Sequence, residues 1–343
     1  MTAPSLSIVV PCYNEEACLD ELHRRLTGAA RTVAADSFEI VLVNDGSRDR
    51  SWAMMAEIAA RDPHVVAINL SRNHGHQLAL TAGLDLCSGE RILIIDADLQ
   101  DPPELLADMI AEMERQQADV VYAVRRARAG ETAFKLWTAN LFYRMLSKLA
   151  DIEIPRDVGD FRLMSRRALD AFLSLPEQAR FIRGMVAWVG FRQVPIVYDR
   201  AERHAGSTKY PFSKMLRFAL DAVTGFSTAP LRFASHFGLW LVGASILLLL
   251  YIAFGWLSGS AIQGWTSLML VVVVLGAVQM FVLGMIGEYL GRLYIESKRR
   301  PLYIVSDIAG HAGGRPSLGH VAHEAEAMAT SESPGGSGTL PIA

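Results

Sequence analysis

The stretch "RILIIDADLQDPPE" (residues 91–104) joins a short apolar run to a cluster of acidic residues. The apolar residues from 91 to 95 predict a buried strand that ends at Asp96 and Asp98. Alternate side chains of a strand share a face, so both carboxylates can point the same way. Such a pair is costly to bury without a cation between its members. Oxygen ligands suit Mg²⁺ or Mn²⁺, and Gln100 would add a third oxygen; the alternative is a solvated acidic loop.

The residues around this stretch predict an α/β fold. Five apolar segments read as strands of a parallel sheet that is covered on both faces: "LSIVVPCY", "FEIVLVNDG", "VVAINLS", "RILIIDAD" and "DVVYAVR". Amphipathic stretches between them predict helices over residues 15–32, 51–61, 77–86 and 102–116. We therefore expect a doubly wound, Rossmann-like, mostly parallel sheet with helices on both faces. Ligands of such sheets bind beyond the carboxyl ends of the strands.

Composition excludes some classes of function. The chain has 343 residues and a net charge of −3, which gives no support for a nucleic-acid-binding surface. Cys12, Cys18 and Cys87 form neither a metal-binding spacing nor a disulfide framework, which favours a reduced, cytoplasmic setting. The N-terminus, "MTAPSLSIVVPCYNEE", lacks the pattern of a signal peptide.

A long uncharged region predicts two transmembrane helices. Residues 233–287 contain no Asp, Glu, Lys or Arg. Within them, 237–257 and 265–286 are each long enough to cross roughly 30 Å of hydrocarbon. The alternative is a buried helical hairpin of a soluble protein. Lysine and arginine flank the pair on both sides but are absent from the loop between, which predicts that the large N-terminal region and both termini lie in the cytoplasm.

These observations divide the chain into five parts. Residues 1–208 are expected to form a cytoplasmic α/β domain, 209–232 amphipathic juxtamembrane helices, and 233–290 the transmembrane hairpin. Residues 291–312 form a cytoplasmic segment, and 313–343 are expected to be a disordered tail because they are rich in Gly, Ser, Ala and Glu. The basic stretch 210–228 would lie in the membrane interface, or else form an ordinary surface helix.

Polar residues follow two further predicted strands. In "VNDGS" (residues 43–47), Gly46 permits a tight turn, while Asp45 could accept hydrogen bonds from a nucleobase or cap the next helix. In "PCYNEE" (residues 11–16), Tyr13 could stack on a base. Glu15 could bind a ribose hydroxyl or simply lie in a first helical turn. Residues 71–76 fit a turn near a diphosphate better than a zinc site at His74 and His76.

Taken together, the motifs resemble a known family. "IVVPCYNEE", "VLVNDGS", "LSRNHGHQLALTAGLD", "IDADLQDPPE" and "GDFRLMSR" occur in this order, and "AWVGFRQ" and "GEYLGRLYIESKRRPLYIVSD" follow. They resemble family 2 glycosyltransferases with the GT-A fold, and among these the polyprenyl-phosphate glycosyltransferases. The closest likeness is to bactoprenol glucosyltransferases of the GtrB type, which are related to dolichol-phosphate mannose synthases. The resemblance extends from about residue 6 to about residue 307.

The resemblance implies a role for each matching residue. The nucleotide sugar would be held by Pro11, Tyr13, Glu15, Asp45, Asp96, Ala97 and Asp98. The metal, Mg²⁺ or Mn²⁺, would be held by Asp96, Asp98 and Gln100. The catalytic residues would be Asp98, Asp160 and Arg162, with Asp160 matching the catalytic carboxylate of the family. The lipid phosphate would be bound by Arg125, Arg126, Arg162, Arg200, Arg203 and Lys209.

Physical chemistry leaves the role of Asp160 open at this point. The second pKa of a phosphomonoester lies near 6, so an acceptor phosphate is mostly ionised at neutral pH and needs little help from a base. It does need positive charge to approach a diphosphate, which arginines such as Arg125, Arg126 and Arg128 would supply unless they form a solvated basic loop. Asp160 would act either as a general base or as an orienting group.

The resemblance implies an inverting transfer of a sugar, with glucose from UDP-glucose preferred, to undecaprenyl or polyprenyl phosphate at the cytoplasmic face of a bacterial inner membrane. It also suggests a homotetramer, and a flippase and a membrane glycosyltransferase acting downstream on cell-envelope glycan. Alternatives are a GDP-mannose or UDP-4-amino-4-deoxy-arabinose donor and a catalytically idle membrane scaffold. A processive polysaccharide synthase is disfavoured because the sequence has no Q-x-x-R-W motif.

Overall fold

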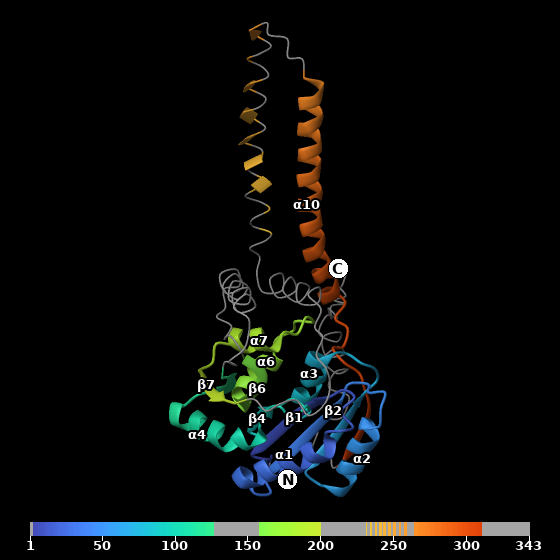
Figure 1. Ribbon diagram of the computed structural model, residues 1–343, viewed down its shortest axis with the longest axis vertical. Helices are drawn as coiled ribbons and strands as arrows, with labels where there is room; N and C mark the ends of the chain where they lie inside the picture. The colour runs from blue at the N-terminus through green and yellow to red at the C-terminus, as the bar shows by residue number, and fades with distance from the viewer. Residues whose placement is uncertain are drawn as a thin grey trace, which may run out of the picture.

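The computed structural model describes residues 3–126, 158–199 and 264–310, and separate positions between 231 and 258. An eight-stranded mixed sheet forms the centre of the catalytic region, with strand order β7-β5-β6-β4-β1-β2-β3-β8 (Figure 1). The strands are β1 Leu6–Cys12, β2 Phe38–Asn44, β3 Val65–Leu70, β4 Arg91–Ile94, β5 Val120–Arg125, β6 Val158–Ser165, β7 Gln193–Tyr198 and β8 Val305–Gly310.

The pairing of the strands confirms the expected α/β class and corrects its details. Strands β4, β1, β2 and β3 are parallel, as their continuous apolar sequences predict. Strand β6 runs antiparallel between β4 and β5, and β8 runs antiparallel beside β3. The sheet therefore reaches beyond residues 1–208, because β8 comes from the segment 291–312.

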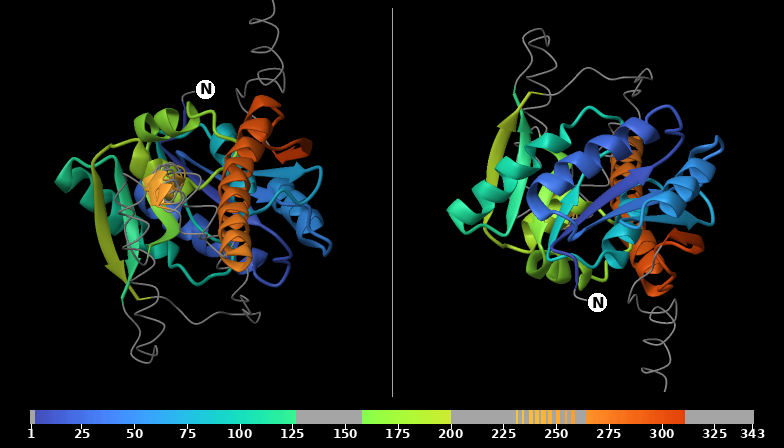
Figure 2. Two further views of the ribbon diagram at one scale, coloured as in Figure 1. Left: turned by 90° about the horizontal axis from the view of Figure 1, so that it is seen from above. Right: turned by 90° about the horizontal axis from the view of Figure 1, so that it is seen from below.

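Helices cover both faces of the sheet (Figure 2). On one face α1 Leu19–Ala34, α2 Ser51–Arg61 and α4 Leu106–Gln116 pack on the sheet through one core cluster. On the other, α3 His76–Leu86, α6 Arg166–Leu173 and α7 Ile182–Trp188 pack through a second cluster. The predicted helix 102–116 begins as the short 3₁₀ turn η1, Pro103–Leu105, since proline fits a first turn but lacks a donor for the interior.

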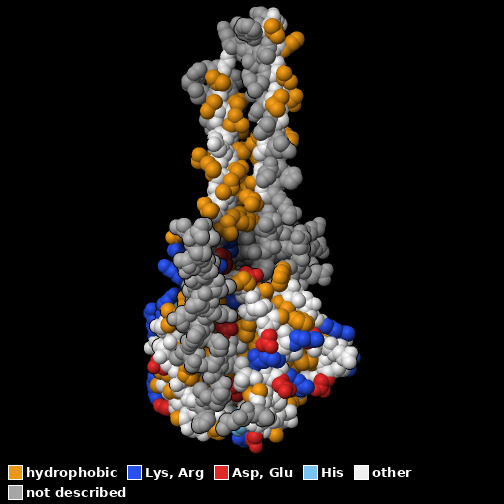
Figure 3. Space-filling model, turned by 180° about the vertical axis from the view of Figure 1, so that it is seen from behind, with side chains coloured by type: hydrophobic (Ala, Val, Ile, Leu, Met, Phe, Trp, Pro, Cys, Tyr) orange, Lys and Arg blue, Asp and Glu red, His pale blue; other side chains and the backbone are white. Residues whose placement is uncertain are grey.

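A long helix rises from the side of the sheet that carries α3, α6 and α7 (Figure 1). This helix, α10 Trp265–Ser297, has 33 residues and exceeds the predicted span 265–286 at its C-terminal end. Among the described residues, one helix is long and apolar enough to cross a membrane, over Val274–Ser297, and its apolar window is not buried in the protein. Exposed hydrophobic side chains line the part of the molecule that projects from the catalytic region and contains α10 (Figure 3). The predicted span 237–257 lies largely outside the described residues, so the two-helix hairpin stays a prediction.

Candidate functional site

The site forms where β1, β2, β4 and β6 present polar residues toward α3 and α7. Along β6, Phe161 and Leu163 belong to the core cluster under α1 and α4, whereas Met164 belongs to the opposite cluster. The period of two therefore turns Asp160 and Arg162 toward α3 and α7. This is the face from which α10 rises (Figure 1).

The two carboxylates after β4 reach the same face in a way that corrects the sequence prediction. The strand ends at Ile94, so Asp96 and Asp98 lie in a turn and not in a strand. The alternation nevertheless continues: Ala97 and Leu99 are buried in the cluster under α1 and α4, and the two aspartates between them are half-buried. Leu99 has a φ of 59°, a left-handed conformation that ends the extended path.

The surroundings of Asp96 fit a cation. Its Oδ1 atom is buried and has no hydrogen-bond partner among the described residues. Burial raises the pKa of Asp96 to about 6, with His76 acting in the opposite direction and Asp160, Asp101 and Asp98 adding to the rise. A positive ion beside this carboxylate would offset the cost of its burial.

The protein alone provides few metal ligands here. Within the described ranges no three His, Cys, Asp or Glu side chains group closely enough to hold a metal. Asp98 accepts a hydrogen bond from the backbone N–H of Gln100 at 3.2 Å, and Gln100 is itself buried. A divalent ion at Asp96 and Asp98 would thus need further oxygens from a bound phosphate, which is the usual mode of Mg²⁺ binding.

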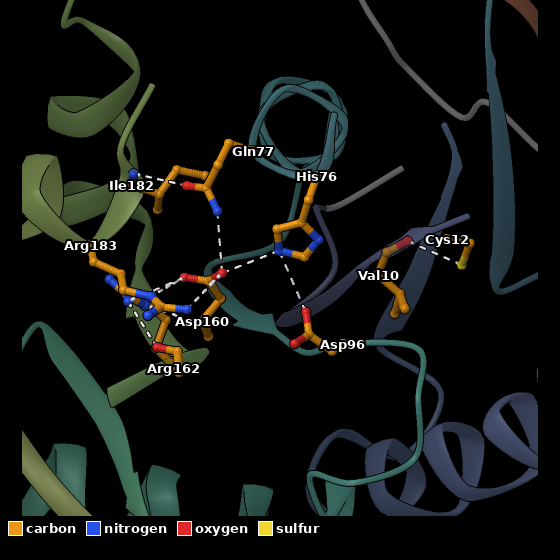
Figure 4. A network of polar contacts seen from close by, with 10 residues as sticks. Val10, Cys12, His76, Gln77, Asp96, Asp160, Arg162, Ile182 and Arg183 are labelled. Atoms are coloured by element: carbon orange, nitrogen blue, oxygen red, sulfur yellow. Dashed lines mark hydrogen bonds and ion pairs between the residues drawn. The ribbon is translucent and has the colours of Figure 1, made fainter. Parts of the chain in front are cut away.

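Asp160 is the centre of the polar network in Figure 4. Its side chain is 4% exposed and accepts hydrogen bonds from Arg183 Nε at 2.8 Å to Oδ1 and from Gln77 Nε2 at 3.2 Å to Oδ2. His76 Nε2 lies 3.2 Å from the same Oδ2 and 3.6 Å from Asp96 Oδ1. His76 therefore stands between the carboxylate after β4 and the carboxylate of β6.

The network keeps Asp160 ionised. Burial by itself would raise the pKa of Asp160, but the hydrogen bond from His76 and the charge and hydrogen bond of Arg183 outweigh it and hold that pKa well below its usual range. The pKa of His76 is raised: burial lowers it, and the contacts with Asp160 and Asp96 more than reverse this. At neutral pH Asp160 is consequently a charged acceptor whose lone pairs are already engaged.

Arg162 lies beneath Asp160 instead of facing a ligand. Its side chain is 3% exposed, and its guanidinium donates to the carbonyl oxygens of Gly159 and Asp160 at 3.2 and 3.4 Å. Burial lowers the pKa of Arg162 to about 10, so it remains charged at neutral pH. In this arrangement Arg162 has no surface to offer to a lipid phosphate, because the backbone and Asp160 surround it.

Predicted nucleotide-binding residues line the ends of β1 and β2. Tyr13 follows β1 and is 43% exposed, while Pro11 is buried in that strand. The carboxylate of Asp45 accepts from the backbone N–H groups of His74 and Gly75, at 2.6 and 3.0 Å. Asp45 does not cap the next helix. The N-cap residue of α2 is Arg50, without a side-chain capping hydrogen bond, and Asp49 just before it accepts from the backbone N–H of Ser51 at 3.0 Å.

A glycine brings the turn after β2 against residues 71–76. Gly46 has a φ of 64°, and a Cβ atom on it would lie 2.5 Å from the backbone nitrogen of Asn73. Asparagines extend this contact along the sheet edge: Asn44 Nδ2 donates to Asn69 Oδ1 at 2.7 Å, and Asn69 Nδ2 donates to Asp307 Oδ2 at 3.1 Å. Strand β8 is thereby bonded to the edge that carries the predicted nucleotide site.

Of the residues predicted to bind the lipid phosphate, the structure describes Arg125, Arg126 and Arg162. Arg125 Nε donates to the hydroxyl of Tyr198 at 3.3 Å, and that hydroxyl donates to buried Asp101. Arg126 is exposed and pairs with Asp199 at 3.1 Å. The predicted residues Arg200, Arg203 and Lys209, together with Arg128, the juxtamembrane stretch 209–232 and the tail 313–343, lie outside the described residues.

Sequence reasoning missed two partners of Asp160. Gln77 was assigned only to a helix, and Arg183 carries no motif by itself. Gln77 joins two elements, since its Oε1 also accepts from the backbone N–H of Ile182 at 3.0 Å. A signal for Gln77 was present in the phosphate-turn motif "NHGHQ", but nothing linked residue 183 to residue 160 before folding brought α7 to β6.

Comparison with known proteins gives consistent matches. The family described as glycosyl transferase family 2 matches residues 7–173. The uncharacterized glycosyltransferase YkcC of Bacillus subtilis (strain 168) is 48% identical over 305 residues, covering 89% of this chain and 94% of that protein. The bactoprenol glucosyl transferase of Shigella phage SfV is 39% identical, covering 88% and 98%. The prophage bactoprenol glucosyl transferase homolog of Escherichia coli (strain K12) is 38% identical, covering 88% and 99%.

Proposed function

The chain belongs to glycosyl transferase family 2, and from this premise we propose that it transfers a hexose, with glucose preferred, from a nucleotide sugar to a polyprenyl phosphate. Relatives named bactoprenol glucosyl transferase match it over nearly their whole length. The carrying observation is the pair of carboxylates Asp96 and Asp160 on either side of His76, on the face from which α10 rises. A reaction between a soluble donor and a membrane-anchored acceptor needs such a placement.

We assign Asp96 and Asp98 to the donor diphosphate. The resemblance favours Asp98 as the direct metal ligand, and the Oδ1 of Asp96, which has no hydrogen-bond partner among the described residues, fits a cation as well. A divalent ion, Mg²⁺ or Mn²⁺, would supply Lewis-acid stabilisation of the charge that develops on the leaving diphosphate. The side chain of Gln100 would assist from the buried end of the turn.

Asp160 acts in this proposal as an orienting group and not as a general base. A group with a pKa well below its usual range is a poor base at neutral pH, because it holds a proton too weakly. The acceptor phosphate is mostly ionised already. Asp160 instead fixes His76, Gln77 and Arg183 in one geometry.

The acceptor phosphate is assigned to cations beyond β5 and β7. Arg125 ends β5 and Arg126 follows it, and Arg200, Arg203 and Lys209 come after β7 along the chain. Arginine suits this role because its planar fork binds phosphate oxygens in pairs. Arg162 is instead assigned to positioning Asp160, because its side chain is 3% exposed and lies 3.9 Å from that carboxylate.

The nucleoside is assigned to the opposite end of the site. Tyr13 is exposed beyond β1 and offers a ring on which a base can stack. Asp45 holds the backbone of residues 74–75 and could use its remaining lone pairs to read base N–H groups. Pro11, Glu15 and Ala97 complete the predicted set; UDP is the preferred nucleotide.

We place the enzyme in a bacterial inner membrane with two spans and both termini in the cytoplasm. The exposed apolar length of α10 supports one span, and the uncharged sequence 237–257 supports the other. A homotetramer, and a flippase and a membrane glycosyltransferase that use the lipid-linked sugar, belong to the same proposal.

A donor screen tests the function. Full-length protein in membranes would be incubated with undecaprenyl phosphate, a divalent cation and a labelled donor, which is UDP-glucose, GDP-mannose or UDP-4-amino-4-deoxy-arabinose. The mass of the lipid product would then be measured by mass spectrometry. We expect a glucosyl lipid and release of UDP that stops when the cation is chelated. A mannosyl or aminoarabinosyl product would correct the donor. Absence of any sugar-lipid with every donor would favour the idle scaffold.

A further inference from the structure

In the last turn of α10, the carboxylate of Glu296 contacts the catalytic region. Both oxygens of Glu296 accept hydrogen bonds from the backbone N–H of Gln178, at 2.9 and 3.1 Å. The two residues are 118 positions apart in the sequence. The apolar window of this helix is not buried in the protein, whereas Glu296 near its C-terminal end bonds to the catalytic region.

Gln178 lies just before α7 in the sequence, and α7 carries residues of the Asp160 network. Helix α7 begins at Ile182, four residues later, and the backbone N–H of Ile182 donates to Gln77 Oε1 at 3.0 Å. The next residue, Arg183, donates to Asp160 at 2.8 Å. Five residues of chain can span at most about 17 Å, so the position of Gln178 restricts where Arg183 can lie.

The chain that follows α10 bonds to α3, the other helix whose residues contact Asp160. Tyr303 donates its hydroxyl hydrogen to Asp85 Oδ2 on α3, at 2.8 Å. The backbone N–H of Ser71 donates to the carbonyl oxygen of Ile304 at 2.9 Å. Ser71 begins the turn that ends at the first residue of α3, His76. Residues 296–304 therefore bond to α3, to the turn before it and to the chain that leads into α7.

Arg180 lies near both contacts, that of Glu296 with Gln178 and that of Tyr303 with Asp85. Its guanidinium carbon lies 5.5 Å from the centroid of the Phe172 ring. Burial lowers the pKa of Arg180, while the negative charges of Asp85 and Glu296 act in the opposite direction. One cation thus lies within the field of the carboxylate on α3 and the carboxylate on α10.

We propose that Glu296 is a positioning residue that couples the end of the membrane helix to the catalytic carboxylate. It fixes residues 178–181, and through them holds Arg183 and Gln77 against Asp160. The inference rests on the proposed glycosyl transfer for its functional consequence: a shift of α10 in the bilayer would move Arg183 and Gln77 relative to Asp160, whereas Glu296 itself bonds to Gln178 and not, among the described residues, to Asp96 or Asp98.

Amide hydrogen exchange of the full-length protein in nanodiscs tests the coupling without any activity. Glu296→Ala should speed exchange in α7 by about tenfold, since a hydrogen bond to a charged acceptor is lost at the start of this segment. Glu296→Gln, which keeps one acceptor oxygen, should show a smaller effect. The matched control is Glu288→Ala, which removes a carboxylate that pairs with Arg292 on the same helix. Unchanged exchange in α7, or equal acceleration in β1, would overturn the inference.

Kinetics of sugar transfer give the second readout. Once wild-type protein is shown to transfer a sugar to undecaprenyl phosphate, Glu296→Ala should lower kcat about tenfold and leave KM for the nucleotide sugar within about twofold. Glu288→Ala should match wild type. An unchanged kcat, or a loss confined to donor binding, would refute the coupling. Lack of transfer by wild type would instead refute the proposed function, and the exchange data would still decide the coupling.

Discussion

Replacing Asp160 by asparagine separates the two roles that its carboxylate could have. The substitution keeps the shape of the side chain and removes its charge. Arg183, His76 and Gln77 each approach the carboxylate within 3.2 Å, and Arg162 is buried below it with its nearest nitrogen 3.9 Å away. An amide has one acceptor oxygen in place of two and cannot balance these cations.

The expected loss of stability follows from burial. Removing one partner of a buried ion pair costs about 3–5 kcal/mol. Arg162 is 3% exposed and feels the full effect, whereas Arg183 and His76 are 36% and 43% exposed and are partly screened by solvent. We therefore expect Asp160→Asn to lower the free energy of unfolding by ~3 kcal/mol at neutral pH, the lower end of that range.

The pH dependence follows from the direction of the shift. The folded-state pKa of Asp160 lies below its unfolded value of about 3.9, so its contribution is fully present above about pH 4 and is lost as pH falls below that. The difference between Asp160→Asn and wild type should shrink in acid. Asp170→Asn is the control, because Asp170 pairs with Arg166 at 3.7 Å on the exposed face of α6 and should cost under about 1 kcal/mol.

Two assays check the reasoning. Chemical denaturation in detergent measures the stability change, and the pH profile of kcat/KM for transfer distinguishes an orienting group from a base. Asp160→Asn should lower transfer without removing a titration from the profile of wild type, because Asp160 stays ionised. If wild type lost activity on the acid side between pH 5 and 8 and Asp160→Asn did not, Asp160 would be the base. If the free energy of unfolding of Asp160→Asn equalled that of wild type, the buried cations would not depend on the charge of Asp160.

Three further changes have expected outcomes. Asp98→Ala should abolish transfer in Mg²⁺ or Mn²⁺ while the thermal unfolding midpoint stays near wild type; retained turnover would move the metal role elsewhere. Gly46→Ala should destabilise the fold by ~1–3 kcal/mol, since its φ of 64° disfavours a side chain and its Cβ would collide with Asn73; a calorimetric midpoint equal to wild type would contradict the predicted collision. For Asp62, burial alone would raise the pKa, but the hydrogen bonds from His64 N–H and the His23 ring lower it. Asp62→Asn should therefore cost ~1–2 kcal/mol above about pH 4 and progressively less below it, which denaturation at pH 7 and pH 3 would test.

Much of the catalytic sheet was predictable because its strands are buried on both faces. Strands such as "FEIVLVN" have few polar residues, so their position in the sequence is unambiguous. Helix α2 occupies the predicted residues 51–61, since its apolar period is clear. Strands β6, β7 and β8 were not among the five predicted strands; the sequences of β6 and β8, "VGDFRLMS" and "VSDIAG", mix charges and small residues with apolar ones. Only pairing with β4, β5 and β3 makes them strands.

The site divides in the same way. Asp96, Asp98 and Asp45 were predicted as site residues because they follow apolar strands, and the ends of parallel strands gather at one edge of a sheet. Arg162 was predicted to face a ligand because it stands in a motif, but its strand carries it into the interior. Arg183 gave no signal, since its role depends on a contact between residues 23 positions apart in two different elements.

The sequence by itself determined the apolar strands, the uncharged segment 233–287 and the acidic residues that follow the strand at residues 91–94, because these depend on local polarity and on the period of neighbouring side chains. Only the tertiary structure decided that Asp160 is held ionised by His76, Gln77 and Arg183, and that Glu296 reaches Gln178. A pKa and an ion pair depend on distances of a few ångströms between elements, and the chain fixes those distances only when the sheet and its helices have packed together.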